Sequence, residues 1–283
     1  MSRRDMIDAL GMDESNDYKI LGGLRLSNGC QVLHVPSYLK GLWESCKTRF
    51  PHRTEWNILA EEDKKIISMD PSRSLQEHFD TAVYCAGAGL WQDDILRKEM
   101  QSSLSSLLPR VTLVRGQSLE LDLEGNDDKK CPSVHPVLCG KYASPTTKRN
   151  HVLVGATREY NAPPLSPEQV YEELQNDEFS NAIPHIWKHV KGVDRITSGI
   201  RVQTQRGNLG RLPIVGQIMR ADDDTDGSSS SAWIFTGLGS RGLLHHGIYG
   251  DVLSDAILAG DGDEPMFEQY PHLAWWKKKQ KRE

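Results

Sequence analysis

Residues 233–258 read WIFTGLGSRGLLHHGIYGDVLSDAIL. The first apolar run predicts a strand and the last part predicts a helix, with a glycine-rich turn between them. Gly237, Gly239 and Gly242 form the pattern G-x-G-x-x-G. Such glycines let backbone N–H groups approach a ligand, and the helix N-terminus presents partial positive charge to a phosphate or an electron-rich ring. The pattern also suits a turn whose glycines only allow tight packing, and both interpretations stay open on these residues alone.

A second segment, residues 199–216, reads GIRVQTQRGNLGRLPIVG. Arg201 lies in its strand-like start, between Ile200 and Val202. An arginine with apolar neighbours needs an anionic partner, because an unpaired buried charge is costly. That partner is either a ligand or one of the many carboxylates of the chain.

The rest of the chain predicts a mixture of strands and helices. Strands are expected at residues 24–26, 32–34, 81–85, 109–123, 134–146, 151–160 and 199–204, and a short one is allowed at 65–69. The segments 109–123, 134–146 and 151–160 fit an antiparallel sheet. Helices are expected at residues 36–49, 166–175 and 183–190, and Ser166 and Gln169 form a capping box in the second. Residues 221–231 predict an acidic, serine-rich surface loop.

The composition excludes several classes of protein. The 283 residues include 34 Lys and Arg and 39 Asp and Glu, which gives a net charge of −5. A chain with this charge has no general electrostatic attraction for nucleic acid or anionic membranes. No apolar run is long enough for a transmembrane helix, and the N-terminal residues do not resemble a signal peptide. Five scattered cysteines disfavour a disulfide framework and a zinc site. We expect a cytoplasmic protein with no metal and no membrane partner, or an organellar one if the natural N-terminus lies upstream.

In their order and spacing, the two segments resemble the flavin-dependent D-amino-acid oxidase superfamily, which includes glycine oxidase and sarcosine oxidase. An arginine-containing strand leads to the sequence LPIVG at residues 212–216, and Gly237–Leu243 opens a helix. Three further segments resemble family motifs, namely Asp80–Gly89, Val114–Gln117 and Val154–Thr157. The closest likeness is to the oxidoreductase domain of the bacterial enzyme that makes 5-methylaminomethyl-2-thiouridine in tRNA.

The resemblance implies a fold of the α/β plus α+β class. A glutathione-reductase-like FAD-binding domain would lack its first βαβ unit, since residues 1–60 contain no early G-x-G-x-x-G, and an antiparallel-sheet substrate domain would be inserted in it. The implied divisions are a polar tail at 1–20, a partial FAD-binding domain at 20–105, the substrate domain at 106–199, the C-terminal part of the FAD-binding domain at 200–276 and a basic tail at 277–283. A chain so divided is expected to bind FAD weakly.

The resemblance also implies roles for particular residues. The flavin ring would face the helix opened by Gly237, Leu238, Gly239, Ser240, Arg241, Gly242 and Leu243, and the adenosine side of FAD would lie along Cys85, Ala86 and Gly87. Arg201 matches the family's arginine that binds the substrate carboxylate as a two-donor fork. No residue is expected to act as a catalytic acid, base or nucleophile.

The function implied is FAD-dependent oxidation of a C–N bond in a small amine or amino-acid-like substrate, of the N-substituted glycine kind. Modified tRNA is a candidate source of that group. Two alternatives stay open: a non-catalytic or truncated family member that acts as a binding or scaffold protein without FAD, and an RNA-associated adaptor that uses the basic tail.

Overall fold

The computed structural model of the chain describes residue 4 and residues 33–56, 79–92, 109–124, 135–219 and 231–277. The chain folds into two compact units. Unit 1 comprises Met1–Trp56 and Arg115–Gly199, and unit 2 comprises Asn57–Val114 and Ile200–Glu283.

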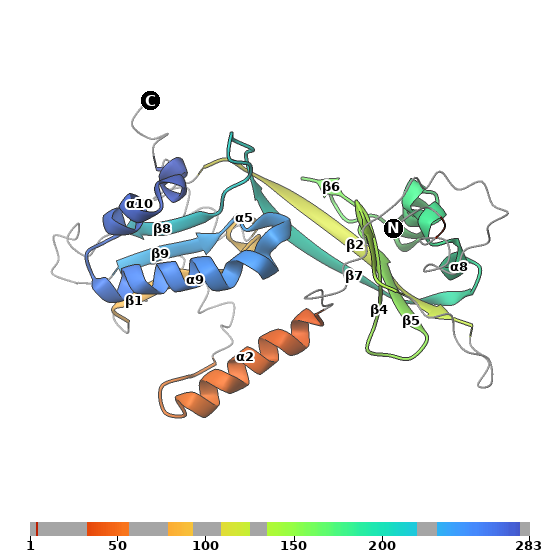
Figure 1. The fold of residues 1–283 in the computed structure, drawn as a ribbon, viewed down its shortest axis with the longest axis horizontal. Helices are drawn as coiled ribbons and strands as arrows, with labels where there is room; N and C mark the ends of the chain where they lie inside the picture. Colours follow the sequence, from red (N-terminus) through yellow and green to blue (C-terminus); the bar gives the residue numbers. More distant parts are fainter. Residues whose placement is uncertain are drawn as a thin grey trace. The chain divides into compact units, whose positions relative to one another are not determined.

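Unit 2 contains a three-stranded sheet in the order β1-β9-β8 (Figure 1). β1 spans Thr81–Tyr84, β8 spans Ile214–Met219 and β9 spans Ser231–Thr236. β1 and β9 are parallel, with Tyr84 opposite Ile234, while β8 and β9 are antiparallel. The strands expected at 81–85 and at the start of 233–258 are therefore confirmed.

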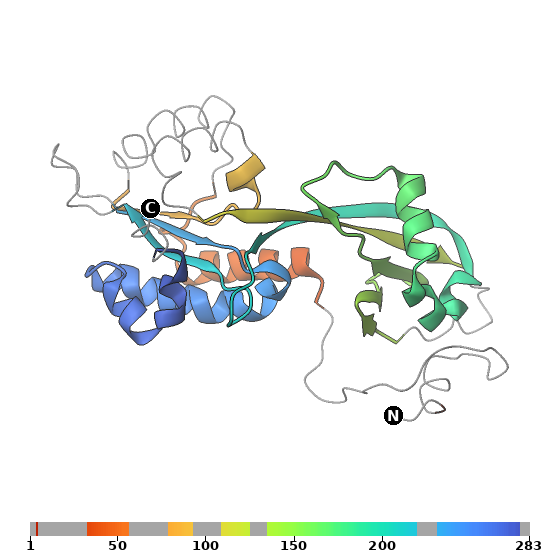
Figure 2. The ribbon, with the colours of Figure 1, turned by 90° about the horizontal axis from the view of Figure 1, so that it is seen from above.

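Helical segments cover both faces of this sheet. Successive residues of β9 are therefore buried on opposite sides. On one face, Trp233 and Val215 pack with Leu253 and Met266, which come from α9 (Gly242–Ala259) and α10 (Glu264–Gln269); Figure 2 shows these helices on one side of the strands. On the other face Ile234 packs in a second cluster, together with residues of the short α5 (Gly89–Gln92) and of η4 (Pro271–Trp276).

Gly216 in β8 occupies a corner that has no room for a side chain. Its φ is +148°, and a Cβ there would lie 2.8 Å from Oδ2 of Asp263 and 3.0 Å from Cζ of Phe267. Asp263 is buried, accepts a 2.7 Å hydrogen bond from the N–H of Gln217 and pairs with Lys277. The glycine therefore lets α10 and the segment after it approach the sheet closely.

Replacing Gly216 by alanine is expected to reduce the free energy of unfolding by about 1–3 kcal/mol, because the new methyl group overlaps the buried Asp263 carboxylate and the Phe267 ring. Gly247→Ala is the matched control: Gly247 is exposed within α9, and nothing lies within 4 Å of its Cβ position. That change should leave stability equal or slightly higher. Urea unfolding of both variants measures the difference, and equal stabilities would show that the corner can relax.

Unit 1 is built on a six-stranded sheet in the order β3-β4-β5-β2-β6, with β7 also paired to β2. The strands are β2 (Val111–Leu123), β3 (Val137–Cys139), β4 (Lys141–Pro145), β5 (His151–Gly155), β6 (Glu159–Tyr160) and β7 (Val190–Thr204). The division between the units falls within β2 and β7. The pairs β2–β5, β4–β5 and β3–β4 are antiparallel, as expected.

Two expected strands are each divided in the structure. Residues 134–146 form the hairpin β3–β4, because Gly140, with φ +71°, reverses the chain. Residues 151–160 form β5 and then β6, which borders β2.

Of the helices expected at residues 166–175 and 183–190, the first has the expected length and the second is shorter. α7 (Pro167–Gln175) has the capping box, with the Ser166 hydroxyl accepting from Gln169 N–H. The helix expected at 183–190 is a single turn, α8 (Pro184–Trp187), which follows η1 (Glu178–Ala182), because the chain enters β7 at Val190. The core of this unit comprises Leu119, Leu121, Leu123, Ala143, Val152, Val154, Val170, Leu174, Phe179, Ile183 and Ile186.

The expected helix at 36–49 is present as α2 (Val35–Arg49), and none of its residues is buried by the described part of the chain. Several expected features lie outside the described residues: the strands at 24–26 and 65–69, most of the loop at 221–231 and most of the basic tail. Leu33 and His34 are described and are not in a strand. Among the helices of the described ranges, none has the length and apolar character needed to cross a membrane.

Candidate functional site

The glycine-rich turn stands between β9 and α9. β9 ends at Thr236, the 3-10 turn η3 spans Gly239–Arg241, and α9 begins at Gly242. Among the residues that the structure describes, no side chain caps the N-terminus of α9, and its first turn contains no acidic residue. The first N–H groups of an 18-residue helix, with the positive end of its dipole, are therefore offered without a side-chain acceptor from this part of the chain.

The two left-handed glycines of the turn serve different needs. Gly237 has φ +74°, and a Cβ there would lie 3.1 Å from Cγ2 of Thr204 and 3.3 Å from the backbone N of Ile214. A side chain at Gly237 would therefore be strained by the left-handed backbone and would press against Thr204 and Ile214 within the protein. Gly239 has φ +58°, but the nearest described atom to its Cβ position is the carbonyl oxygen of Val202, at 4.0 Å. Gly239 thus leaves open space beside the helix N-terminus.

The end of β7 lies against this turn. Gln203 forms an antiparallel bridge with Leu238. The segment is held in place because the Thr204 hydroxyl donates a 2.7 Å hydrogen bond to the Leu212 carbonyl and Arg211 donates to the Thr204 carbonyl. Arg201, half-buried, precedes Val202 in the same strand. The structure therefore brings the strand of Arg201 and the glycine-rich turn together.

Cys85, Ala86 and Gly87 follow β1 directly. Since β1 and β9 are parallel neighbours, this segment and the glycine-rich turn both follow the carboxyl ends of their strands, at the same edge of the sheet. Gly87 has φ +55° and opens the turn into α5. Cys85 and Ala86 are exposed, although desolvation still raises the pKa of the Cys85 thiol.

The structure adds one residue that the sequence analysis missed. Thr236 is the last residue of β9 and is 4% exposed, and its Oγ1 is buried with no hydrogen-bond partner among the described residues. A buried hydroxyl without a hydrogen bond reduces the stability of the fold by about 1–3 kcal/mol. A hydrogen bond to a bound ligand is the simplest way to remove this penalty. A threonine at the end of an apolar strand is common, and nothing in the sequence distinguishes this one.

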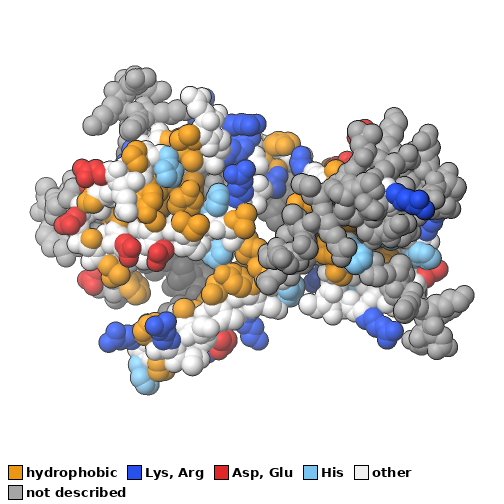
Figure 3. Space-filling model, in the orientation of Figure 1, with side chains coloured by type: hydrophobic (Ala, Val, Ile, Leu, Met, Phe, Trp, Pro, Cys, Tyr) orange, Lys and Arg blue, Asp and Glu red, His pale blue; other side chains and the backbone are white. Residues whose placement is uncertain are grey.

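The start of α9 also carries exposed apolar side chains. Leu243, Leu244 and Ile248 are exposed by 43%, 73% and 64%, and Figure 3 shows hydrophobic side chains gathered over this helix. Ser240 and Arg241, the polar members of the turn, are exposed as well.

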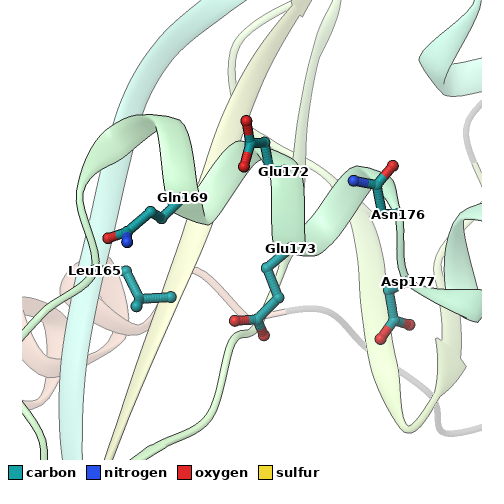
Figure 4. A pocket seen from close by; sticks show the side chains of 6 residues that line it. All are labelled: Leu165, Gln169, Glu172, Glu173, Asn176 and Asp177. Atoms are coloured by element: carbon teal, nitrogen blue, oxygen red, sulfur yellow. The ribbon is translucent and has the colours of Figure 1, made fainter.

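Two other polar clusters lie in unit 1. A pocket beside α7 is lined by Leu165, Gln169, Glu172, Glu173, Asn176 and Asp177 (Figure 4), and Lys141 pairs with two of its carboxylates at 3.3 Å. Glu120, His151 and Asp194 lie close enough to share a cation. However, Arg195 and Lys148 already neutralise these carboxylates, and the Lys148 hydrogen bond lowers the pKa of Asp194. We interpret both clusters as ion-pair networks.

Comparison with known proteins gives a family and a set of distant structures, which includes two oxidases. A glycine oxidase from Bacillus cereus ATCC 14579 is 16% identical, with 65% of this chain aligned to 44% of that one and a TM-score of 0.43. An iminodiacetate oxidase from Chelativorans sp. BNC1 is 20% identical, with 68% of this chain aligned to 46% of that one and a TM-score of 0.46. The matched region thus spans less than half of either protein. No curated protein matches the chain.

The family model described as DAO, FAD dependent oxidoreductase, matches residues 3–256, which is most of the chain. The chain therefore belongs to the DAO family of FAD-dependent oxidoreductases.

Proposed function

We propose that the chain binds FAD with the ring against the turn before α9, and oxidises a C–N bond of an amine or amino-acid-like substrate. The observation that carries this proposal is the N-terminus of α9, uncapped by any described side chain, beside the open position at Gly239. The chain belongs to an FAD-dependent family. The edge of a flavin needs hydrogen-bond donors, which the N-terminus of α9 supplies, and space for a flat ring, which the position beside Gly239 leaves open.

The residues present fit such a group. The orphaned Oγ1 of Thr236 offers a further polar contact at the same turn. Contacts to the ring are assigned to Gly237, Leu238, Gly239, Ser240, Arg241, Gly242 and Leu243, and contacts to the adenosine side to Cys85, Ala86 and Gly87. The shared sheet edge after β1 and β9 supports this division.

When bound, FAD supplies an acceptor for the hydride that leaves the carbon next to the amine. The first N–H groups of α9 stabilise negative charge at the edge they face, since they are already oriented before the reaction. Arg201 binds the carboxylate of the substrate and thereby orients the reacting carbon. No side chain needs to act as a nucleophile.

The finer parts of the proposal concern domains and the substrate. Residues 20–105 and 200–276 are assigned to FAD binding and residues 106–199 to the substrate. The glutathione-reductase-like description of the first part, the N-substituted glycine substrate and the source of that substrate in modified tRNA rest on the sequence resemblance. They stay predictions.

Anaerobic mixing with amines tests the proposal. The full chain, purified and saturated with FAD, should lose flavin absorbance when N-methylglycine or iminodiacetate is added, because two electrons pass to the flavin. Glycolate keeps the carboxylate and lacks the amine, and should leave the absorbance unchanged. A preparation that stays colourless after incubation with FAD would favour the binding-protein alternative instead.

A further inference from the structure

The ion-pair network on the sheet of unit 1 contains a set of side chains that suits a metal ion. Glu120 in β2, His151 in β5 and Asp194 in β7 each offer one ligand atom, and these atoms lie within 4.8 Å of one another. β2 pairs with both β5 and β7, and all three residues belong to unit 1. Because strands of one sheet carry the three side chains, the backbone fixes their spacing.

The register of the sheet brings the ligand atoms close together. His151 is opposite Asp122 in the antiparallel pair β2–β5. Residues two apart in a strand share a face, so Glu120 is the diagonal neighbour of His151. Nε2 of His151 lies 3.8 Å from Oδ2 of Asp194. Two ligand atoms of one tetrahedral zinc ion lie about 3–4 Å apart, since each is about 2.0–2.2 Å from the metal. The pair therefore needs little movement to bind one ion.

Outer hydrogen bonds already orient two of the three ligands. Nδ1 of His151 lies 2.9 Å from the carbonyl oxygen of Arg149. A carbonyl only accepts, so Nδ1 carries the proton, and Nε2 of the neutral ring keeps the lone pair that binds a metal. Arg195 donates to Oε2 of Glu120 through Nε at 3.1 Å and Nη2 at 2.7 Å, which leaves Oε1 for another cation. Metal ligands in proteins usually have outer partners of this kind.

Lys148 supplies that cation in the structure. Its Nζ lies 2.6 Å from Oδ2 of Asp194 and 3.7 Å from Oε1 of Glu120. The side chains of Lys148 and Asp194 are 55% and 37% exposed, so the position of the ammonium can be reached from solvent. An exposed ion pair is weak, because water competes with it and a long side chain must be held in place. A divalent cation can therefore displace the ammonium.

We propose that Glu120, His151 and Asp194 form a binding site for a divalent transition-metal ion of the zinc class, which replaces the ammonium of Lys148. One imidazole nitrogen and two carboxylate oxygens are ligands that zinc accepts, and three protein ligands leave a fourth position for water. Mg²⁺ and Ca²⁺ prefer sites made of oxygen ligands alone. The site is independent of the proposed function, since none of these residues is assigned to FAD or to the substrate carboxylate.

Calorimetric titration of the full chain with ZnCl₂, in a buffer with excess MgCl₂, tests the site. The wild type should bind zinc, and Mg²⁺ should not compete. His151→Gln should weaken zinc binding at least about tenfold, since the loss of an outer partner alone has an effect of this size. His52→Gln is the matched control and should bind zinc as the wild type does, because His52 is exposed and belongs to no such cluster among the described residues.

Lys148→Met adds a result that a purely structural ion pair would not give. Removing a competing ammonium should tighten zinc binding about two- to fivefold. Thermal unfolding without metal shows whether each variant keeps the fold, and if His151→Gln does not fold, Lys148→Met decides alone. The assignment is wrong if the wild type binds no zinc, if folded His151→Gln binds zinc as tightly as the wild type, or if Lys148→Met does not bind it more tightly.

Discussion

Gly239→Ala is expected to weaken FAD binding at least about tenfold, whereas Gly260→Ala should leave it unchanged. Both glycines have left-handed φ values, +58° and +76°, and a Cβ at either position has no close contact with the described residues. Each substitution should therefore reduce stability by a similar amount, about 1 kcal/mol. Only Gly239 borders the proposed ring site, because Gly260 caps the opposite end of α9.

Flavin dissociation constants of the two variants, measured by fluorescence titration, give the comparison. Gly239→Val should abolish flavin retention, since a β-branched side chain adds bulk and disfavours the turn. If Gly239→Ala and Gly260→Ala bind FAD equally well, the turn does not face the cofactor.

Arg201→Ala is expected to reduce kcat/KM on an amino-acid substrate by about 2–4 kcal/mol of transition-state binding, because the substrate carboxylate loses a two-donor charged partner. Arg201→Lys should recover only part of the loss, since an ammonium cannot reproduce the planar fork. Arg206→Ala is the matched control, because Arg206 is an exposed arginine five positions further along the chain.

Steady-state kinetics and thermal unfolding together separate the two roles that Arg201 can have. A substrate-binding arginine changes the kinetics by far more than any accompanying change in the melting temperature explains. Near-normal kinetics, or a loss explained by unfolding, would mean that Arg201 serves the fold, and the prediction of a carboxylate substrate would fail with it.

Local signals in the sequence were sufficient to predict many of the helices and strands. The strand, turn and helix of 233–258 are present because apolar periodicity and glycine placement act over a few residues. The capping box at Ser166 and Gln169 is present for the same reason. The association of the Arg201 strand with the glycine-rich turn came instead from the family resemblance, since the bridge from Gln203 to Leu238 joins distant segments.

Features that depend on three-dimensional surroundings could not be predicted. The three side chains of the proposed metal site come from separate stretches of the sequence, and only the fold shows that they meet. Gly216 has an essential packing role that composition does not reveal. The helix expected at 183–190 is limited to Pro184–Trp187, because β7 begins at Val190. The pairing of β7 in the sheet outweighs the local helix propensity of these residues.

The central claim, that the chain holds FAD, is tested most directly by the thermal unfolding of the full chain with and without FAD. The titration must extend to high FAD concentration, because the sequence predicts weak binding. At ten times its dissociation constant, FAD should stabilise the folded chain by about 1.4 kcal/mol, which raises the melting temperature by roughly 3–6 °C. A melting temperature that does not change at any FAD concentration would contradict the account.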